Sequence, residues 1–220
     1  MQREAERIAP LVGNQGLQAL VNNAGIVVAG PLLHLPLEEL RTQFEVNVIG
    51  LIATTKAFAP LLGAKDNCPH PPGKIYNMSS VAGKLAQPFL GPYCASKHAV
   101  ESLSESLRME LFPYGIDVVV LGPGVVRTPI WDKAQDINLD RYAHTGYKKA
   151  LHKLQNFVDH HSKTGYDQAE FGRLVADIIG KAQPRWRYAL VKEHLSKWVL
   201  PSLMSKKQFA AVIGKRLGLR

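Results

Sequence analysis

Four short apolar segments, separated by longer amphipathic ones, constrain the fold of this chain most. The apolar segments are residues 17–21, 74–78, 116–121 and 187–191, and turn-forming residues follow the first three. Strands that alternate with helices cannot pair as hairpins, so this order predicts an α/β fold with a parallel sheet. Residues 116–121 are almost entirely apolar and rich in valine, which predicts a strand that is buried on both faces.

Two segments carry apolar side chains at helical spacing. The first begins near Pro36 and has acids in its first turn, and the second runs from Tyr93 to Phe112. Residues 2–12 are predicted to form the last turns of a further helix, which glycines end. We expect the apolar stripes to pack on the sheet, and they consist of Leu37, Leu40, Phe44, Val48 and Leu51 in the first helix and of Val100, Leu103, Leu107 and Leu111 in the second.

Length and composition fit one globular domain. A chain of 220 residues, 46% of them hydrophobic, can bury a sizeable core. No unbroken run of about 18 apolar residues occurs, so we expect no transmembrane helix. Only Cys68 and Cys94 are present, which is too few for a disulfide scaffold, and we therefore expect a cytoplasmic protein.

The positive charge is concentrated at the C-terminus. Residues 192–220 hold seven Lys or Arg and one acid, Glu193, so they supply +6 of the net charge of +9. Two interpretations of this basic tail remain open. It lies on an anionic membrane surface through its interspersed apolar side chains, or it packs its apolar side on the body and leaves its lysines in water. No nucleic-acid-binding module accompanies the charge, so we do not expect nucleic acid as a partner.

Tyr93 and Lys97 open the second helix and are four residues apart. At that spacing they lie on the same helix face, one turn from each other. A free phenol has a pKa of about 10, and a fixed ammonium nearby lowers it. The spacing predicts a tyrosine that exchanges protons near neutral pH, although Tyr-x-x-x-Lys also occurs by chance on many helices.

Five motifs occur in order along the chain, and each alone is explained by an ordinary turn, cap or core position. Their combined order and spacing over residues 5–130 resemble the short-chain dehydrogenase/reductase family. All of them fall at strand ends or on the helices that follow, where α/β sheets bind ligands. The motifs are Asn22-Asn23-Ala24-Gly25, Asn47, Ser79-Ser80, Tyr93-x-x-x-Lys97 and Pro123-Gly124-x-x-x-Thr128.

The resemblance implies an oxidoreductase that interconverts an alcohol and its carbonyl with NAD or NADP. It implies that Tyr93 exchanges the substrate proton and that Ser80 polarises the carbonyl oxygen. Lys97 would lower the pKa of Tyr93 and hold the nicotinamide ribose, and Asn47 would anchor a water that relays protons. Ser80 is preferred to Ser79 because the family's serine lies thirteen positions before the tyrosine. The implied cofactor-binding residues are Asn22, Ala24, Gly25, Tyr93, Lys97, Pro123, Gly124, Val126 and Thr128.

The chain departs from the family pattern at its start. A member would begin with a strand and a Gly-x-x-x-Gly-x-Gly turn for the cofactor phosphates, and neither occurs before Leu17. We therefore expect an N-terminally truncated chain, with the C-terminal half of a Rossmann-like, doubly wound parallel sheet in residues 1–191. A helical lid is expected at about 126–183, followed by the C-terminal helix of the basic tail. Strand 17–21 would then be an exposed sheet edge.

Two functions from different classes remain open. The chain is an NAD(P)-dependent oxidoreductase, or it is a catalytically silent fragment that only associates with other subunits. In the family the helices at 37–62 and 93–112 form the dimer interface, so we expect a homo-oligomer through them. The wording Tyr93-Cys94-Ala95-Ser96-Lys97 is similar to hydroxysteroid and retinol dehydrogenases, which implies a lipid-like substrate.

Other reactive side chains fit structural roles better. Cys94 lacks a base partner, so packing is expected. The lid aromatics Trp131, Tyr142 and Tyr147 either line an apolar substrate pocket or form the core of the lid. Histidines 144, 152, 160 and 161 do not have the spacing of a compact ligand set, and no metal site is expected.

Overall fold

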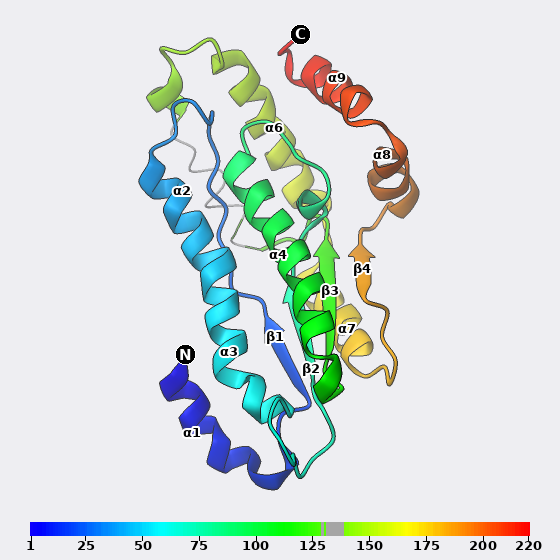
Figure 1. Cartoon of the computed structure of the whole chain (residues 1–220). Helices are drawn as coiled ribbons and strands as arrows, with labels where there is room; N and C mark the ends of the chain where they lie inside the picture. The colour runs from blue at the N-terminus through cyan, green and yellow to red at the C-terminus, as the bar shows by residue number, and fades with distance from the viewer. Residues whose placement is uncertain (129, 131–138) are drawn as a thin grey trace.

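A parallel sheet of four strands organises the chain (Figure 1). The computed structural model describes residues 1–128, 130 and 139–220. The strands lie in the spatial order β1 (Ala19–Asn22), β2 (Lys74–Met78), β3 (Asp117–Pro123) and β4 (Arg187–Leu190), and each pair is parallel. The predicted α/β fold is therefore confirmed. β1 begins two residues later than the predicted strand 17–21. Leu17 N donates to Leu61 O of the helix Gly50–Leu62 (2.8 Å) and not to a neighbouring strand.

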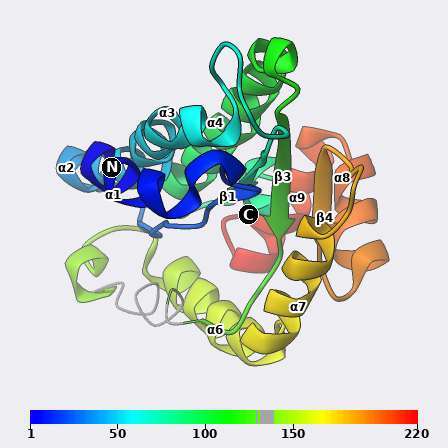
Figure 2. The same cartoon turned by 90° about the horizontal axis from the view of Figure 1, so that it is seen from below.

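Helices cover both faces of the sheet, as Figure 2 shows from below. On one face, α2 (Leu37–Phe44), a π-helical turn (Glu45–Ile49) and α3 (Gly50–Leu62) form one continuous helix beside α4 (Gly91–Glu110). On the other face lie α6 (Lys148–Thr164) and α7 (Gln168–Ile179). The residues of β3 from Val118 to Leu121 are at most 2% exposed, so this strand is covered on both sides as predicted.

Two hydrophobic clusters hold the layers on the sheet. Leu62 and Leu111 pack with Ile75 and Val118 on the α3–α4 side. Ile178 of α7 packs with three strand residues, Tyr76, Val119 and Leu121, on the opposite side. Adjacent residues of one strand thus belong to different clusters, as strand geometry requires.

The predicted helix stripes are buried or half-buried except at one position. Val48, Leu51, Val100 and Leu111 belong to the core. Leu37 is instead 66% exposed, so its assignment to the stripe is wrong, and Leu35, just before the helix, is buried at 8% exposure. The helix from Leu37 to Leu62 is long and apolar enough to cross a membrane by length and composition alone. Core helices of α/β folds pass the same test, and this one packs against β1.

The N-terminal segment has the predicted helix, α1 (Gln2–Val12), followed by a 3₁₀ turn (Gly13–Gln15). Further 3₁₀ turns are Val81–Gly83, Phe112–Tyr114 and Leu139–Tyr142. Gly13 and Gly16 both have positive φ angles, of 47° and 65°, which glycine adopts without steric cost. These two residues therefore end the helix and turn the chain toward β1.

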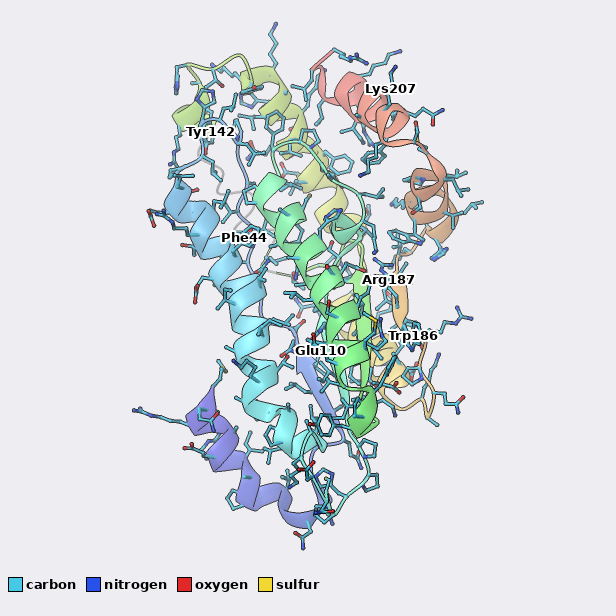
Figure 3. All side chains as sticks on the ribbon, viewed as in Figure 1. Phe44, Glu110, Tyr142, Trp186, Arg187 and Lys207 are labelled. Atoms are coloured by element: carbon cyan, nitrogen blue, oxygen red, sulfur yellow. The ribbon has the colours of Figure 1, made fainter. Side chains whose placement is uncertain are left out.

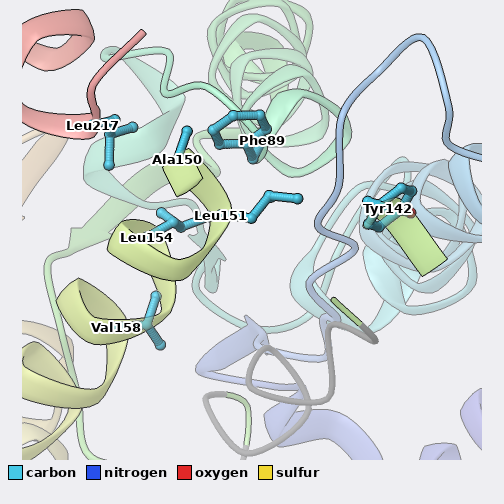
Figure 4. Packing of buried hydrophobic residues seen from close by; sticks show 7 residues of the cluster. All are labelled: Phe89, Tyr142, Ala150, Leu151, Leu154, Val158 and Leu217. Carbon is cyan, nitrogen blue, oxygen red and sulfur yellow. The ribbon is translucent and has the colours of Figure 1, made fainter. Parts of the chain in front are cut away.

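The C-terminal segment folds back onto the lid. It contains a π-helical turn (Leu195–Val199), α8 (Leu200–Leu203) and α9 (Lys206–Leu217), which a Ser205–Gln208 capping box starts. Leu217 joins a buried cluster on α6, together with Leu154 and Phe89 (Figure 4). The interpretation that the tail packs an apolar side on the body is thus confirmed for α9. Other apolar side chains of the segment remain exposed, namely Leu195, Leu200, Leu203 and Val212.

The same cluster shows whether the lid aromatics line a substrate pocket or form the core of the lid. Tyr142 is 2% exposed within it, and Tyr147 packs against it with its ring 5.6 Å from that of Phe89. Both therefore form lid core. Trp131 lies outside the described residues.

Candidate active site

A cavity of about 460 Å³ opens at the carboxyl ends of β1, β2 and β3. It is lined by Tyr93 and Lys97 from α4 and by segments that follow the three strands. Of the seven other predicted cofactor-binding residues six line it, namely Ala24, Gly25, Pro123, Gly124, Val126 and Thr128. The parallel sheet brings these residues together because all strand ends of one sense meet at one edge.

Asn47 holds the segment after β1 by its side-chain amide. Its Oδ1 accepts from Ile26 N (2.8 Å), and its Nδ2 donates to Ile26 O (3.1 Å) and to Ser96 Oγ (3.1 Å). The side chain is 1% exposed, within the π-helical turn. Such turns are frequent at functional sites because they redirect a side chain out of the regular helix pattern.

Gln43 supports the same segment and was not predicted from the sequence. Its Oε1 accepts from Val28 N (2.7 Å) and its Nε2 donates to Ile26 O (2.8 Å). Gln43 and Asn47 are one helical turn apart, and both are fully buried. Together they fix the backbone of residues 26–28, and with it the turn that carries Gly25 and lines the cavity.

Asn22 lies at the end of β1, but its side chain points away from the cavity. Its Nδ2 donates to Thr55 Oγ1 (2.9 Å) and to Asn77 Oδ1 (2.8 Å). Asn77 in turn donates to Ser104 Oγ (2.9 Å). This chain of buried polar groups ties β1 and β2 to both helices of the overlying layer. Asn23, which was not predicted, lines the cavity instead.

The two serines after β2 have different environments. Ser79 is 1% exposed, and its Oγ donates to Glu101 Oε1 (2.7 Å). The side chain of Ser80 is hydrogen-bonded to Tyr93, and its Oγ also accepts from Ala82 N (3.1 Å). Of the two serines only Ser80 interacts with the predicted tyrosine, and its Oγ also donates to Pro123 O (3.4 Å).

Lys97 is a buried cation beside Gly25. Its side chain is 5% exposed, and Nζ donates to Met78 O (2.8 Å). A Cβ atom at Gly25 would lie 3.6 Å from this Nζ, so glycine leaves the space in front of the ammonium open. Burial lowers the pKa of Lys97 from 10.5 to about 8.

The structure does not support the prediction that Lys97 lowers the pKa of Tyr93. Burial raises the pKa of this phenol, and the hydrogen bond with Ser80 opposes the increase only in part. Lys97 Nζ lies 5.8 Å from the centroid of the Tyr93 ring, and its closest partner is the Met78 carbonyl. That prediction is therefore wrong in this structure. Tyr93 remains a protonated phenol at neutral pH, which is the form that donates a proton.

A second cavity, of about 280 Å³, meets the first at Tyr93 and Gly124. Ser80 also lines it, while most of its remaining wall is apolar. Tyr93 thus stands between the two cavities. Cys94, its neighbour, is 3% exposed, and burial raises the pKa of its thiol, which suits packing rather than nucleophilic attack.

The residues of the larger cavity fit the nicotinamide half of a dinucleotide. Lys97 carries three donors and uses one on Met78, so two are available for vicinal hydroxyl groups such as those of a ribose. Gly25 allows close approach of a ligand to the backbone. Among the described residues no group of three or more His, Cys, Asp or Glu side chains could hold a metal ion.

The burial of Lys97 predicts a pH-dependent stability. Between pH 8 and 10.5 the unfolded chain binds a proton at Lys97 that the folded chain lacks. The free energy of unfolding therefore rises with pH in this window. Below pH 8 Lys97 is charged in the folded chain as well, so the whole cost of burying the ammonium lowers the stability. Relative to Lys97→Met, which cannot titrate, we expect the wild-type chain to gain about 3 kcal/mol across this window in urea unfolding. Lys207→Met, at an exposed lysine, is the matched control. A difference between wild type and Lys97→Met that does not vary with pH would contradict this prediction.

Comparisons with known proteins identify the family of the chain. The family model described as short chain dehydrogenase matches residues 4–138. The NADPH-dependent 3-dehydrocapnine reductase of Ornithobacterium rhinotracheale is 38% identical over 212 residues, which cover 94% of this chain and 74% of that protein. The mitochondrial D-beta-hydroxybutyrate dehydrogenase of Rattus norvegicus is 29% identical over 189 residues, or 79% of this chain and 52% of that protein.

Solved structures share the fold. A short-chain dehydrogenase from Streptomyces avermitilis superposes with a TM-score of 0.69 at 23% identity, covering 97% of this chain and 75% of that one. A short-chain dehydrogenase/reductase from Burkholderia phymatum, solved in complex with NAD, gives a TM-score of 0.65 at 27% identity, covering 82% and 63% of the two chains. The family model spans more than half of the chain and includes the tyrosine, the lysine and both serines, so this chain belongs to the short-chain dehydrogenase family, a family of oxidoreductases.

Proposed function

We propose that Tyr93, Ser80 and Lys97 carry the reaction of this oxidoreductase, whose cofactor is NAD or NADP. The observation that carries the proposal is the position of Tyr93 between two cavities. The larger one fits the nicotinamide half of the cofactor, and the smaller, more apolar one is suited to a substrate. When bound, the cofactor supplies or accepts the hydride.

The protein groups act on the substrate oxygen. During reduction, Tyr93 donates its phenolic proton to the carbonyl oxygen, and Ser80 donates a hydrogen bond to the same oxygen and polarises it. Lys97 holds the ribose hydroxyls of the cofactor through its free donors. During oxidation the phenol must first lose its proton, so its raised pKa favours reduction near neutral pH and oxidation at high pH.

The lining of the smaller cavity supports a lipid-like substrate. Its wall includes Leu90, Val125, Leu154 and Val158, and besides Ser80 and Tyr93 its polar lining consists of Gln87, Ser196, Lys197 and Arg216. A pocket of this kind orients a ligand by a few polar groups at one end and binds the rest by apolar contact. Retinol dehydrogenase 5 of Mus musculus, a relative that is 37% identical over 131 residues, acts on an apolar alcohol by its name.

Cofactor binding is the direct test. We expect NADH or NADPH to bind the purified chain with micromolar affinity in a fluorescence titration. Lys97→Ala should weaken that affinity about 10- to 100-fold, because it removes hydrogen bonds from a charged donor. Lys207→Ala, at an exposed lysine of α9, should leave the affinity unchanged. A chain that is folded by circular dichroism but binds neither nucleotide would contradict the proposal.

That negative result would favour a second candidate, a catalytically silent subunit that only associates. Exposed apolar groups favour association: Val21 on the edge strand β1 is 39% exposed, and Ile49 and Met109 on the α3–α4 layer are 53% and 61% exposed. A homo-oligomer through the helix Leu37–Leu62 and α4 would cover the last two. In the oxidoreductase proposal the same contact only assembles active subunits.

A further inference from the structure

The cavity beside Tyr93 continues beneath the C-terminal helices. A neighbouring cavity of about 540 Å³ shares four lining residues with it, namely Leu85, Pro201, Phe209 and Ile213. Leu85 lies after β2, and the other three belong to α8 and α9. The two cavities therefore form one elongated space with α8 and α9 as one wall, which we call the α9 groove.

The α9 groove has its polar groups at defined places. Ser80 and Tyr93 lie at its inner end. Beyond them the inner cavity is walled by apolar side chains of α6 and α9, among them Leu154 and Ile213. Transfer of apolar surface into such a lining is favourable, by about 0.8 kcal/mol for each methylene group. A ligand whose carbonyl lies at Tyr93 is thus stabilised further by each apolar group that it extends along the groove.

Arg216, an exposed residue at the rim of the inner cavity, has no acidic partner among the described residues. Lys197 pairs with Glu193 (2.7 Å). The guanidinium of Arg216 instead stacks over the Phe157 ring, 4.6 Å from its centroid, and forms no ion pair with a carboxylate of the described chain. A planar guanidinium binds carboxylate, sulfonate or phosphate oxygens in a bidentate manner. Because Arg216 and Tyr93 line the same 280 Å³ cavity, one ligand can contact both side chains.

We propose that the α9 groove binds a long-chain anionic amphiphile as substrate. Its carbonyl or hydroxyl carbon lies at Tyr93, its anionic group meets Arg216, and its unbranched alkyl chain passes between Leu85 and Ile213 into the outer cavity. A flexible chain suits this path better than a rigid ring system, because the occupant must pass the side chains that separate the two cavities. The inference rests on the proposed function and narrows its lipid-like substrate to one class.

Binding of unreactive amphiphiles to the full chain tests the groove without turnover. By titration calorimetry, 1-decanesulfonate and decanoate, below their micellar concentrations, should each occupy one site. Decanesulfonate should bind about tenfold more tightly than octanesulfonate, since two methylene groups are added. Arg216→Gln should weaken decanesulfonate binding about tenfold and leave 1-decanol binding unchanged, while Lys215→Gln, next to it and exposed, changes neither.

Filling the groove provides the second arm. Ile213→Trp and Leu85→Trp, from opposite walls, should each weaken decanesulfonate binding at least about tenfold. Val212→Trp, at the adjacent position that is 53% exposed, should not. Two walls are tested so that a folding defect in one variant, visible by circular dichroism, leaves the other informative. Affinity that is independent of chain length, or that falls equally in Val212→Trp, would overturn the proposal.

The two proposals fail in different ways. A chain that reduces a small ketone with NAD(P)H but shows no chain-length-dependent amphiphile binding overturns the groove assignment and leaves the proposed function standing. A chain that binds decanesulfonate as expected, yet neither binds nucleotide nor turns over any ketone, supports the groove and overturns the proposed function.

Discussion

Tyr93→Phe is expected to lower the rate of carbonyl reduction by about 10²- to 10⁴-fold while cofactor affinity changes little. The ring still fills its place between the two cavities, but the proton donor for the carbonyl oxygen is lost. Steady-state kinetics and nucleotide titration on the same preparation separate the two effects. The loss should appear in kcat, because the proton moves in the transition state and not on binding.

Tyr147→Phe is the matched control for this variant. It removes a phenol from the lid cluster, where the ring packs on Phe89 and lines neither of the two cavities that meet at Tyr93. Its turnover should equal that of the wild-type chain. If Tyr93→Phe reduces ketones at the wild-type rate, the proton comes from another donor and the assigned role of Tyr93 is wrong.

Glu101→Ala should lower the free energy of unfolding by about 3 kcal/mol, because it leaves the half-buried guanidinium of Arg187 and the buried hydroxyl of Ser79 without their partner. Glu101 is 4% exposed on α4 and accepts from Arg187 Nε (2.9 Å) and Nη2 (3.0 Å) and from Ser79 Oγ (2.7 Å). Arg187, labelled on β4 in Figure 3, stacks on the Trp198 ring, 4.5 Å from its centroid. This set of contacts links the C-terminal segment to the serine that precedes Ser80.

Chemical denaturation of three variants checks this prediction. Glu105→Ala, one turn further along the same helix at a site that is 61% exposed, should change stability by less than about 1 kcal/mol. The double variant Glu101→Leu/Arg187→Met should recover most of the loss, because no unpaired charge remains buried. Equal stabilities of Glu101→Ala and Glu105→Ala would show that the pair contributes nothing to the fold.

The resemblance to the family supplied the candidate site residues, and local geometry explains why they lie together. Tyr93 and Lys97 share a helix face by their spacing, and Ser80 and Gly124 follow strands whose ends meet in any parallel sheet. The four strands and the helices that precede β2 and β3 followed from the apolar patterns, whereas between β3 and β4 only a helical lid was expected, without the bounds of α6 and α7. Only positions at element ends, such as Leu37 and the start of β1, differ from the expectation, since there the neighbouring layer decides which side chain is covered.

Long-range contacts decided the rest. Gln43 has no motif around it, and its role depends on residues 26–28 lying across the helix. Glu101 and Arg187 are 86 residues apart, so nothing local predicts their pairing. Asn22 belongs to a recognisable motif, yet the register that pairs it with Asn77 turns its side chain inward. The direction of the Tyr93 pKa depends on burial, which spacing does not reveal.

The strand order has a consequence for how the molecule folds. Spatial order and chain order coincide from β1 to β4, so each strand adds to the edge formed by the strand before it. None of the four described strands has to insert between two others that are already paired, and each crossover closes only the loop between consecutive strands. During synthesis the sheet can therefore extend strand by strand in the direction of translation. β4 joins last, followed by α8 and α9, which form one wall of the α9 groove.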